Sequence, residues 1–206
     1  MKGLNKAIMD YLKSFSERVE NKDILDMGCG TGNYTFLFAK KNRVVGTDIQ
    51  DVVNEKYRNF EFKIADATNL PFSDEIFDLA ISFDVIEHIE NDKKMLNEAY
   101  RVLKKGGELF LETPNRDRFS HILMKLFGAD IKYPLNLGTN DNLGETIHIR
   151  EYTAEELGAL AKAAGFENIQ VKPFWFGVPF FRYGLTNPPK FLQKNCHCLI
   201  LSAIKS

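Results

Sequence analysis

The residues whose spacing best defines a chemistry are three alternate glycines, Gly28, Gly30 and Gly32, with the carboxyl group of Asp26 two positions before the first. An apolar run leads into them at 24–27, and an apolar, helix-like run follows at 34–39. Glycines at such a turn bring backbone N–H groups close to a ligand, because no Cβ stands in the way. A dinucleotide fold needs G-x-G-x-x-G, whose third glycine would fall at Asn33 here.

A second carboxylate, Asp48, ends the strand expected at 43–47. It would lie at the carboxyl end of the strand next to the glycine turn, where a carboxylate can accept hydrogen bonds from both hydroxyls of a ribose. The alternative is that Asp48 only caps the next helix, because Asp51 is close by. Its place on the second strand favours the ribose role.

Two histidines can handle a proton. His88 follows the apolar strand expected at 77–83, and His148 precedes the helix expected at 154–164. Histidine titrates near physiological pH and suits a general base. The alternative for each is a structural histidine tied to a backbone group.

Strands expected at 23–27, 43–47, 61–65, 77–83, 108–112, 169–174 and 196–204 must position these groups. Helices are expected at 4–19, 33–41, 92–104, 116–127 and 154–164, with Gly106 and Gly107 capping the third. Alternating strands and helices predict an α/β fold with a parallel sheet. Its ligands would lie beyond the carboxyl ends of the strands.

The motifs occur in the order and spacing of the class I S-adenosylmethionine (SAM) dependent methyltransferases, which the chain resembles over about residues 20–115. It looks closest to the small-molecule enzymes related to ubiquinone and menaquinone biosynthesis. The resemblance implies a doubly wound, Rossmann-like sheet of seven strands in the order 3-2-1-4-5-7-6, with strand 7 antiparallel. The family's Leu-x-Pro-Gly-Gly turn reads Leu-Lys-Lys-Gly-Gly at 103–107, which removes a proline but no chemical group.

The resemblance also implies a cofactor, SAM, and a set of residues around it. Asp66 would accept from the adenine amino group. The helix at 1–22 would cover the cofactor. The other residues expected to contact SAM are Tyr11, Asp26, Gly28, Gly30, Gly32, Asp48, Ile49, Ala67 and Phe83.

Residues 84–88 allow a sharper hypothesis. Asp84, Glu87, His88 and the distant His148 resemble the Glu-x-x-Glu-His…His metal set of small-RNA 2′-O-methyltransferases and, in part, that of quinone O-methyltransferases. Such a set could bind a divalent cation and lower the pKa of a substrate hydroxyl. A Glu-His pair after the fourth strand is also common in relatives that need no metal. The sequence therefore assigns no metal ligand, and His88 and His148 stand as the catalytic candidates.

We expect residues 1–206 to form a single domain, in which 116–147 is an insertion that covers the substrate or is a surface excursion without chemical meaning. The aromatic loop at 177–195 could line a hydrophobic substrate site, dock a partner, contact a membrane surface or form a small satellite core.

The favoured function is methyl transfer from SAM to a small, hydrophobic, hydroxyl-bearing molecule. A non-catalytic module that binds SAM or regulates a partner is the main alternative. A nicotinamide oxidoreductase is disfavoured by the glycine pattern, although Tyr100 and Lys104 match a Tyr-x-x-x-Lys pair. An RNA 2′-O-methyltransferase is disfavoured by the net charge of −1 and the lack of a basic stripe.

The composition is that of a soluble globular protein, and it indicates the cytoplasm. No apolar run approaches the roughly 20 residues that cross a bilayer, and no signal-peptide core stands at the N-terminus. Three cysteines, Cys29, Cys196 and Cys198, make no disulfide framework. Cys196 and Cys198 flank His197, but the alternation of this run predicts a strand with buried thiols rather than a metal site. The oligomeric state is not predicted.

Overall fold

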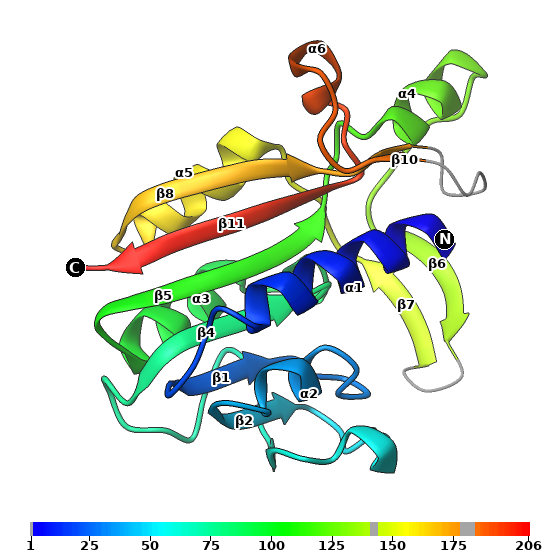
Figure 1. Ribbon diagram of the computed structural model, residues 1–206. Helices are drawn as coiled ribbons and strands as arrows, with labels where there is room; N and C mark the ends of the chain where they lie inside the picture. The colour runs from blue at the N-terminus through cyan, green and yellow to red at the C-terminus, as the bar shows by residue number, and fades with distance from the viewer. Residues whose placement is uncertain (1, 141–143, 178–183) are drawn as a thin grey trace.

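A computed structural model describes residues 2–140, 144–177 and 184–206. Its centre is a twisted sheet of seven strands with helices on both faces (Figure 1). The strand order is β3-β2-β1-β4-β5-β11-β8. The strands are β1 (Asp23–Met27), β2 (Arg43–Asp48), β3 (Glu61–Ile64), β4 (Phe77–Phe83), β5 (Leu103–Pro114), β8 (Phe166–Phe174) and β11 (Cys198–Lys205).

This order confirms the predicted 3-2-1-4-5-7-6, because β8 is the sixth strand of the sheet along the chain and β11 is the seventh. The first five strands are mutually parallel, and β11 runs antiparallel to both β5 and β8. The carboxyl ends of β1 to β5 therefore meet at one edge of the sheet, which is where a doubly wound fold binds its ligands.

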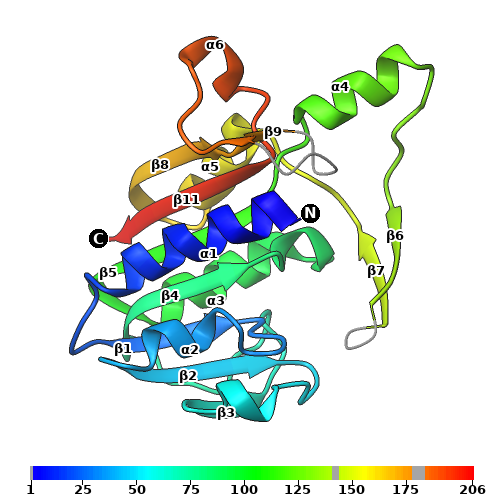
Figure 2. The ribbon, with the colours of Figure 1, turned by 45° about the vertical axis from the view of Figure 1, so that its right-hand side comes forward.

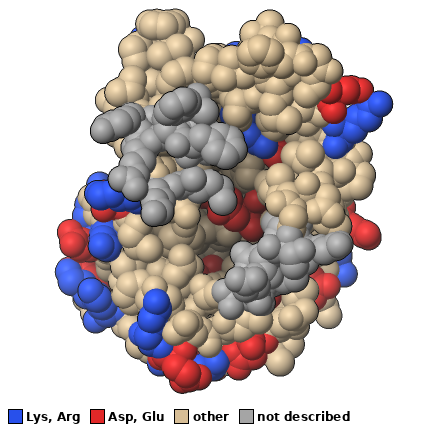
Figure 3. Space-filling view, turned by 90° about the vertical axis from the view of Figure 1, so that its right-hand side faces the viewer, with Lys and Arg blue, Asp and Glu red and all other residues tan. Residues whose placement is uncertain are grey.

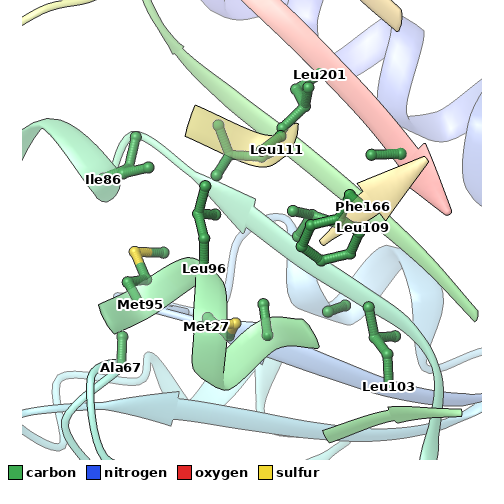
Figure 4. Close-up of a cluster of buried hydrophobic side chains, with 14 of the residues drawn as sticks. Met27, Ala67, Ile86, Met95, Leu96, Leu103, Leu109, Leu111, Phe166 and Leu201 are labelled. Carbon is green, nitrogen blue, oxygen red and sulfur yellow. The ribbon is translucent and has the colours of Figure 1, made fainter. Parts of the chain in front are cut away.

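Two apolar layers hold the helices on the sheet. Helices α1 (Lys2–Ser16) and α2 (Thr35–Phe38) cover one face, and α3 (Asp92–Val102) and α5 (Ala154–Ala163) cover the other (Figure 2). Figure 4 shows the second layer, where Met95 and Leu96 of α3 lie among sheet residues such as Met27 and Leu111. The central strand β4 is buried along nearly its whole length, as expected for a parallel strand covered on both faces.

Helix α3 ends earlier than predicted. Its last residue is Val102, and Leu103 already begins β5, where it is fully buried and pairs with Phe77. Gly106 has a positive φ of 76° and lies within β5, where the pairing with β4 shifts register between Leu103 and Glu108, so it does not cap the helix. Burial and pairing of Leu103 outweigh the helical pattern of the residues around it.

The insertion after β5 contains more structure than the single helix and long loop that were predicted. Helix α4 (Phe119–Leu126) is followed by a hairpin of β6 (Leu135–Asn140) and β7 (Gly144–His148). Both project from the carboxyl edge of the sheet (Figure 2). Gly and Asn are depleted in strands, so the composition of this segment conceals the hairpin.

The region expected as one aromatic loop, 177–195, contains β10 (Gly184–Leu185) and the short helix α6 (Lys190–Gln193). Strand β10 pairs with β9 (Phe176–Gly177). Residues 178–183 of this loop lie outside the described residues. Within the described ranges, no helix has the length and apolarity needed to cross a membrane.

Cys196 and Cys198 are buried, as the alternation of their run predicted, and Cys29 is buried as well. Cys29 lies in the glycine turn, and Cys198 lies at the start of β11.

Candidate functional site

The candidate site is a crevice at the carboxyl edge of the sheet. Seen from that edge, the molecule has a hollow in which acidic side chains are visible (Figure 3). The glycine loop (residues 28–32) borders it. Gly28 and Cys29 donate their backbone N–H groups to the carbonyl of Thr47, at 2.8 and 2.9 Å, so the loop is fastened to the end of β2.

The glycines are required by the shape of this loop. Gly28 has a φ of +83°, and a Cβ there would come within 2.4 Å of Cγ2 of Val85. Gly30 has a φ of +49°, and a Cβ there would meet nothing within 4 Å. The loop is thus tightly packed on one side and open at Gly30, as a loop that presents its backbone to a ligand should be.

Asp26 lies beneath the loop and is almost fully buried. Its Oδ2 accepts a hydrogen bond of 2.6 Å from the Thr35 hydroxyl, while its Oδ1 has no partner. Burial raises the pKa of Asp26 to about 7, although the bond from Thr35 opposes that rise. A buried oxygen without a partner is costly, so Asp26 is suited to accept from a donor on a ligand.

Asp48 is the last residue of β2 and Asp66 lies two positions after β3, so both stand at the carboxyl edge of the sheet. Asp48 accepts a hydrogen bond of 2.9 Å from the backbone N–H of Gly30 through Oδ2, which ties the carboxylate to the glycine loop. The neighbouring Ile49 is 66% exposed, an apolar surface that a flat ligand could cover. Asp66 is exposed and accepts 2.7 Å from the N–H of Thr68, and Ala67 is buried in the core.

Two of the predicted cofactor contacts lie in the core layer on the α1 face. The ring of Tyr11 packs on Phe110 and Phe174, with centroids 6.2 and 5.2 Å apart. Phe83 is buried, 6.1 Å from Phe110 by centroids. Its edge also meets the ring of Tyr34, at 5.3 Å. Tyr11 and Phe83 therefore make the contacts of core-packing residues. Tyr34, which was not predicted, lies two positions after the loop and packs against Phe83.

The two predicted histidines do come together, although 60 positions separate them in the chain. His88 ends the 3₁₀ helix η2 (Ile86–His88) after β4, and His148 ends β7. Their ring centroids are 5.0 Å apart. Between them lies Glu87, whose Oε1 is 3.9 Å from Nε2 of His88 and 4.0 Å from Nε2 of His148. We call Glu87, His88 and His148 the histidine cluster.

In each histidine of the cluster, Nδ1 is hydrogen-bonded to an oxygen atom of the protein. Nδ1 of His88 is 2.7 Å from the carbonyl oxygen of Ile147, and Nδ1 of His148 is 2.8 Å from Oε1 of Glu151. Carbonyl and carboxylate oxygens only accept, so each Nδ1 carries the proton. Both Nε2 atoms are therefore left with a lone pair on the side of Glu87.

Glu87 is fully buried. Its Oε2 accepts 2.8 Å from the Thr113 hydroxyl, and its Oε1 has no partner. Burial, and next the charge of Asp84, hold the pKa of Glu87 well above its usual range. Burial also lowers the pKa of His88. The cluster thus brings together the Oε1 of Glu87, which has no hydrogen-bond partner among the described residues, and two imidazole nitrogens, with the three ligand atoms all within 4.8 Å of one another.

Asp84, the fourth residue of the metal hypothesis, is not in this group. It adopts a left-handed backbone with a φ of +53° directly after β4. Its N–H donates to the carbonyl of Glu112 at 3.2 Å. Glu112 is itself buried, with Oε2 lacking a partner, and burial raises its pKa well above the usual range.

Sequence reasoning missed several residues that support the cluster: Arg118, Thr113 and Glu151. Glu151 could have been found from its spacing, because an acid three positions after a histidine can reach it. No pattern in the sequence indicates Arg118 or Thr113, since both reach the site only through the fold.

Comparison with known proteins places this geometry in a context. A family model described as a methyltransferase domain matches residues 2–171. A protein of Mycolicibacterium smegmatis, described as a probable S-adenosylmethionine-dependent methyltransferase, is 33% identical over 157 residues, which are 74% of this chain and 54% of that protein. The chain thus spans about half the length of this curated relative.

Two further similarities cover more of the proteins compared. The ubiquinone biosynthesis O-methyltransferase of Hydrogenovibrio crunogenus is 28% identical over 195 residues, which are 89% of this chain and 78% of that protein. The crystal structure of a SAM-dependent methyltransferase from Thermotoga maritima has a TM-score of 0.70 at 22% identity, and the match covers 97% of this chain and 89% of that chain. The latter likeness concerns the fold alone.

Proposed function

Because this chain belongs to the methyltransferase domain family, we propose that it transfers the methyl group of SAM to a hydroxyl group of a small, hydrophobic acceptor in the cytoplasm. The observation that carries the choice of a hydroxyl acceptor is the histidine cluster, in which two imidazole lone pairs and an unpartnered carboxyl oxygen face one another. The proposal treats the chain as one domain that contains both the cofactor site and the acceptor site.

The crevice fits SAM on observations of this chain. The unpartnered Oδ1 of Asp26 can accept from a donor of a bound ligand. The open face of Gly30 leaves room for a ligand beside the backbone. Asp48 and Asp66 stand at the ends of successive strands, where they can accept from a ribose and an adenine amino group.

SAM supplies a methyl carbon that already carries its leaving group, so the protein needs no covalent nucleophile. What this chain must do is hold the acceptor oxygen in line with that carbon, at about 3–3.5 Å. A hydroxyl oxygen must also lose its proton before or during the transfer. The site therefore also needs residues that promote the loss of this proton, and we assign that role to the histidine cluster.

The cluster fits a divalent cation by its donor set. Glu87 would bind the ion through Oε1, and His88 and His148 would bind it through Nε2. Imidazole and carboxylate together suit first-row transition metals better than Mg²⁺. A bound cation would lower the pKa of an acceptor hydroxyl. The Nδ1–H groups, held by Ile147 and Glu151, would keep both rings turned toward the ion.

A small acceptor is also supported by what the chain resembles and by its charge. The O-methyltransferase relative from Hydrogenovibrio crunogenus is named for ubiquinone biosynthesis. The net charge of −1 offers no field for holding a nucleic acid.

The test is a panel of hydroxyl-bearing and amine-bearing acceptors with SAM, read by release of S-adenosylhomocysteine and by mass of the product. SAM and NAD are titrated in parallel by calorimetry. We expect heat with SAM and none with NAD, and turnover of hydroxyl acceptors that a chelator abolishes and Co²⁺ or Mn²⁺ restores.

Other outcomes would replace parts of the proposal. Turnover that survives the chelator but is lost in His148→Asn would make that histidine a general base without a metal. Binding of SAM without turnover of any acceptor would favour a non-catalytic module. Absence of heat with SAM would remove the function altogether.

A further inference from the structure

The ring of His148 is hydrogen-bonded to a second buried acid, Glu151, which a histidine does not need in order to accept a proton or bind a metal. Glu151 accepts from Nδ1 of His148 through Oε1 and forms an ion pair with Arg118 through Oε2. The Glu151 side chain is fully buried, and that of Arg118 is 9% exposed. Oε1 of the Glu151 carboxylate thus faces His148 and Oε2 faces Arg118, with Nδ1 of His121 3.9 Å from Oε2.

Arg118 is itself fixed by the backbone. Its Nη1 also donates 3.1 Å to the carbonyl oxygen of Asn115, just after β5. The side-chain amide of Asn115 donates to the carbonyl oxygens of Lys194 and Cys196, at 2.9 and 2.8 Å. The guanidinium is therefore anchored to the rigid end of the sheet, and it cannot turn away without breaking these bonds.

Stability alone gives no reason for this ion pair. Burying two charges costs about as much as their attraction returns, and apolar residues in such places are often equally or more stable. A geometric role explains the ion pair better, because Arg118 holds the Glu151 carboxylate so that its Oε1 faces Nδ1 of His148. Burial by itself would raise the pKa of Glu151, but the hydrogen bonds from His148 and Arg118 outweigh it and lower the pKa to about 2.

We propose that Glu151, held in place by Arg118, is a positioning residue that keeps the proton of His148 on Nδ1 and its Nε2 lone pair toward Glu87. The consequence for metal affinity rests on the proposed function above. The consequence for the imidazole proton does not, because it can be observed in the metal-free protein.

The isosteric change Glu151→Gln is informative because Arg118 has no acceptor to offer. The glutamine must turn its carbonyl oxygen to Arg118, and its NH₂ group then points at His148. A donor opposite Nδ1 forces that nitrogen to accept, so the proton moves to Nε2. The ring would keep its shape but lose the lone pair that faces Glu87.

The experiment is two-bond ¹H–¹⁵N spectroscopy of histidine-labelled, metal-free protein. The chain has four histidines, and His148→Asn identifies the signals of His148. We expect the Nδ1–H form in the unaltered chain and the Nε2–H form in Glu151→Gln. Glu155→Gln, an exposed acid on α5, is the matched control and should leave the His148 signals unchanged.

Titration with Co²⁺ by calorimetry and by visible absorbance gives the second readout. We expect Glu151→Gln to weaken Co²⁺ binding about 10–100-fold, as loss of an outer partner of a metal-bound histidine does. Arg118→Lys keeps the positive charge and should retain more affinity than Arg118→Met.

The outcomes separate the two proposals. An Nε2–H form of His148 in the unaltered chain would overturn the positioning role, and this holds even when Glu151→Gln does not fold. An Nδ1–H form that persists in folded Glu151→Gln would overturn it too. If the unaltered chain shows the Nδ1–H form, and Glu151→Gln the Nε2–H form, but Co²⁺ does not bind, the positioning role stands and the metal of the proposed function fails.

Discussion

The crevice has two halves, which we propose to bind the cofactor and the acceptor, and they are built from different kinds of residue. The cofactor half, at the ends of β1, β2 and β3, consists of a glycine loop and three carboxylates, Asp26, Asp48 and Asp66, each directly beside its strand. The acceptor half, at the ends of β4 and β5, consists of ionisable side chains from η2, β7 and the residues after it, of which Glu87, His148 and Glu151 are buried and His88 is partly exposed. The first half combines the backbone shape of the loop with one buried acid, Asp26, whereas the second relies on a group of buried acids and two histidines.

This difference carries a consequence for stability and specificity. A glycine loop with positive φ angles is strained only if a side chain is added. Buried carboxyl groups such as Glu87 and Glu112 cost free energy in the unliganded protein, because each keeps an oxygen without a partner. We infer that a bound ligand supplies the missing partners of these oxygens in the acceptor half. Substitutions in one half should therefore have little effect on the binding or chemistry of the other half.

The largest expected effect is in the acceptor half. His148→Asn removes a proton-handling or metal-binding nitrogen while leaving the glycine loop intact. Methyl transfer should fall about 10²–10⁴-fold, while the Kd for SAM measured by calorimetry stays within about twofold. If His148→Asn lost SAM affinity as well as methyl transfer, the cofactor half and the acceptor half would not act independently.

A smaller but still large effect is expected from Gly28→Ala in the cofactor half. The added Cβ would lie 2.4 Å from Val85 at a φ of +83°, so the loop must shift. We expect SAM affinity to fall at least about tenfold, together with a backbone cost of about 1–3 kcal/mol in the free energy of unfolding. Gly106→Ala is the matched control, because its φ is +76° but nothing lies within 4 Å. Gly106→Ala should show the same backbone cost without a change in the Kd for SAM. If Gly28→Ala and Gly106→Ala lost SAM affinity equally, the glycine loop would have no local role in binding SAM.

Of the two variants in the cofactor half, Asp26→Asn has the smaller expected effect on SAM affinity, and it sharpens the comparison through pH. The folded pKa of Asp26 is about 7 against an ordinary value of 3.8. Between these values the folded chain holds a proton that the unfolded chain has lost, so this group makes stability fall as pH rises through the window. The variant should therefore be more stable at pH 8, by up to about 4 kcal/mol, since one pKa unit corresponds to about 1.36 kcal/mol.

Urea unfolding of both proteins at pH 4 and pH 8 measures this difference. The stability gap between Asp26→Asn and the unaltered chain should widen from pH 4 to pH 8, while the variant binds SAM about tenfold more weakly. A gap that is the same at both pH values would mean that Asp26 is ionised in the folded chain, as it is when unfolded.

The sequence by itself predicted the alternation of strands and helices, because their periods are local patterns, while the order of the strands came from the resemblance to class I methyltransferases. Asp26 and Asp48 lie at the ends of β1 and β2, and the glycines and Asp66 come just after β1 and β3, so a parallel sheet brings the residues that we propose for the cofactor to one edge. The same reasoning identified His88 and His148 as candidates, because their residue type implies chemistry.

Only the tertiary structure decided what those histidines can do. Pairing of β6 with β7 and the bond from Ile149 N–H to the Glu87 carbonyl, at 2.9 Å, bring His148 to η2 across the insertion. The tautomers depend on Ile147 and Glu151, and Glu151 depends on Arg118. Tyr11 likewise met Phe110 through packing of α1 on the sheet, and Phe83 met Phe110 through the pairing of β4 with β5. Contacts of this kind join residues far apart in the chain, and no local period records them, because they form only when the elements pack.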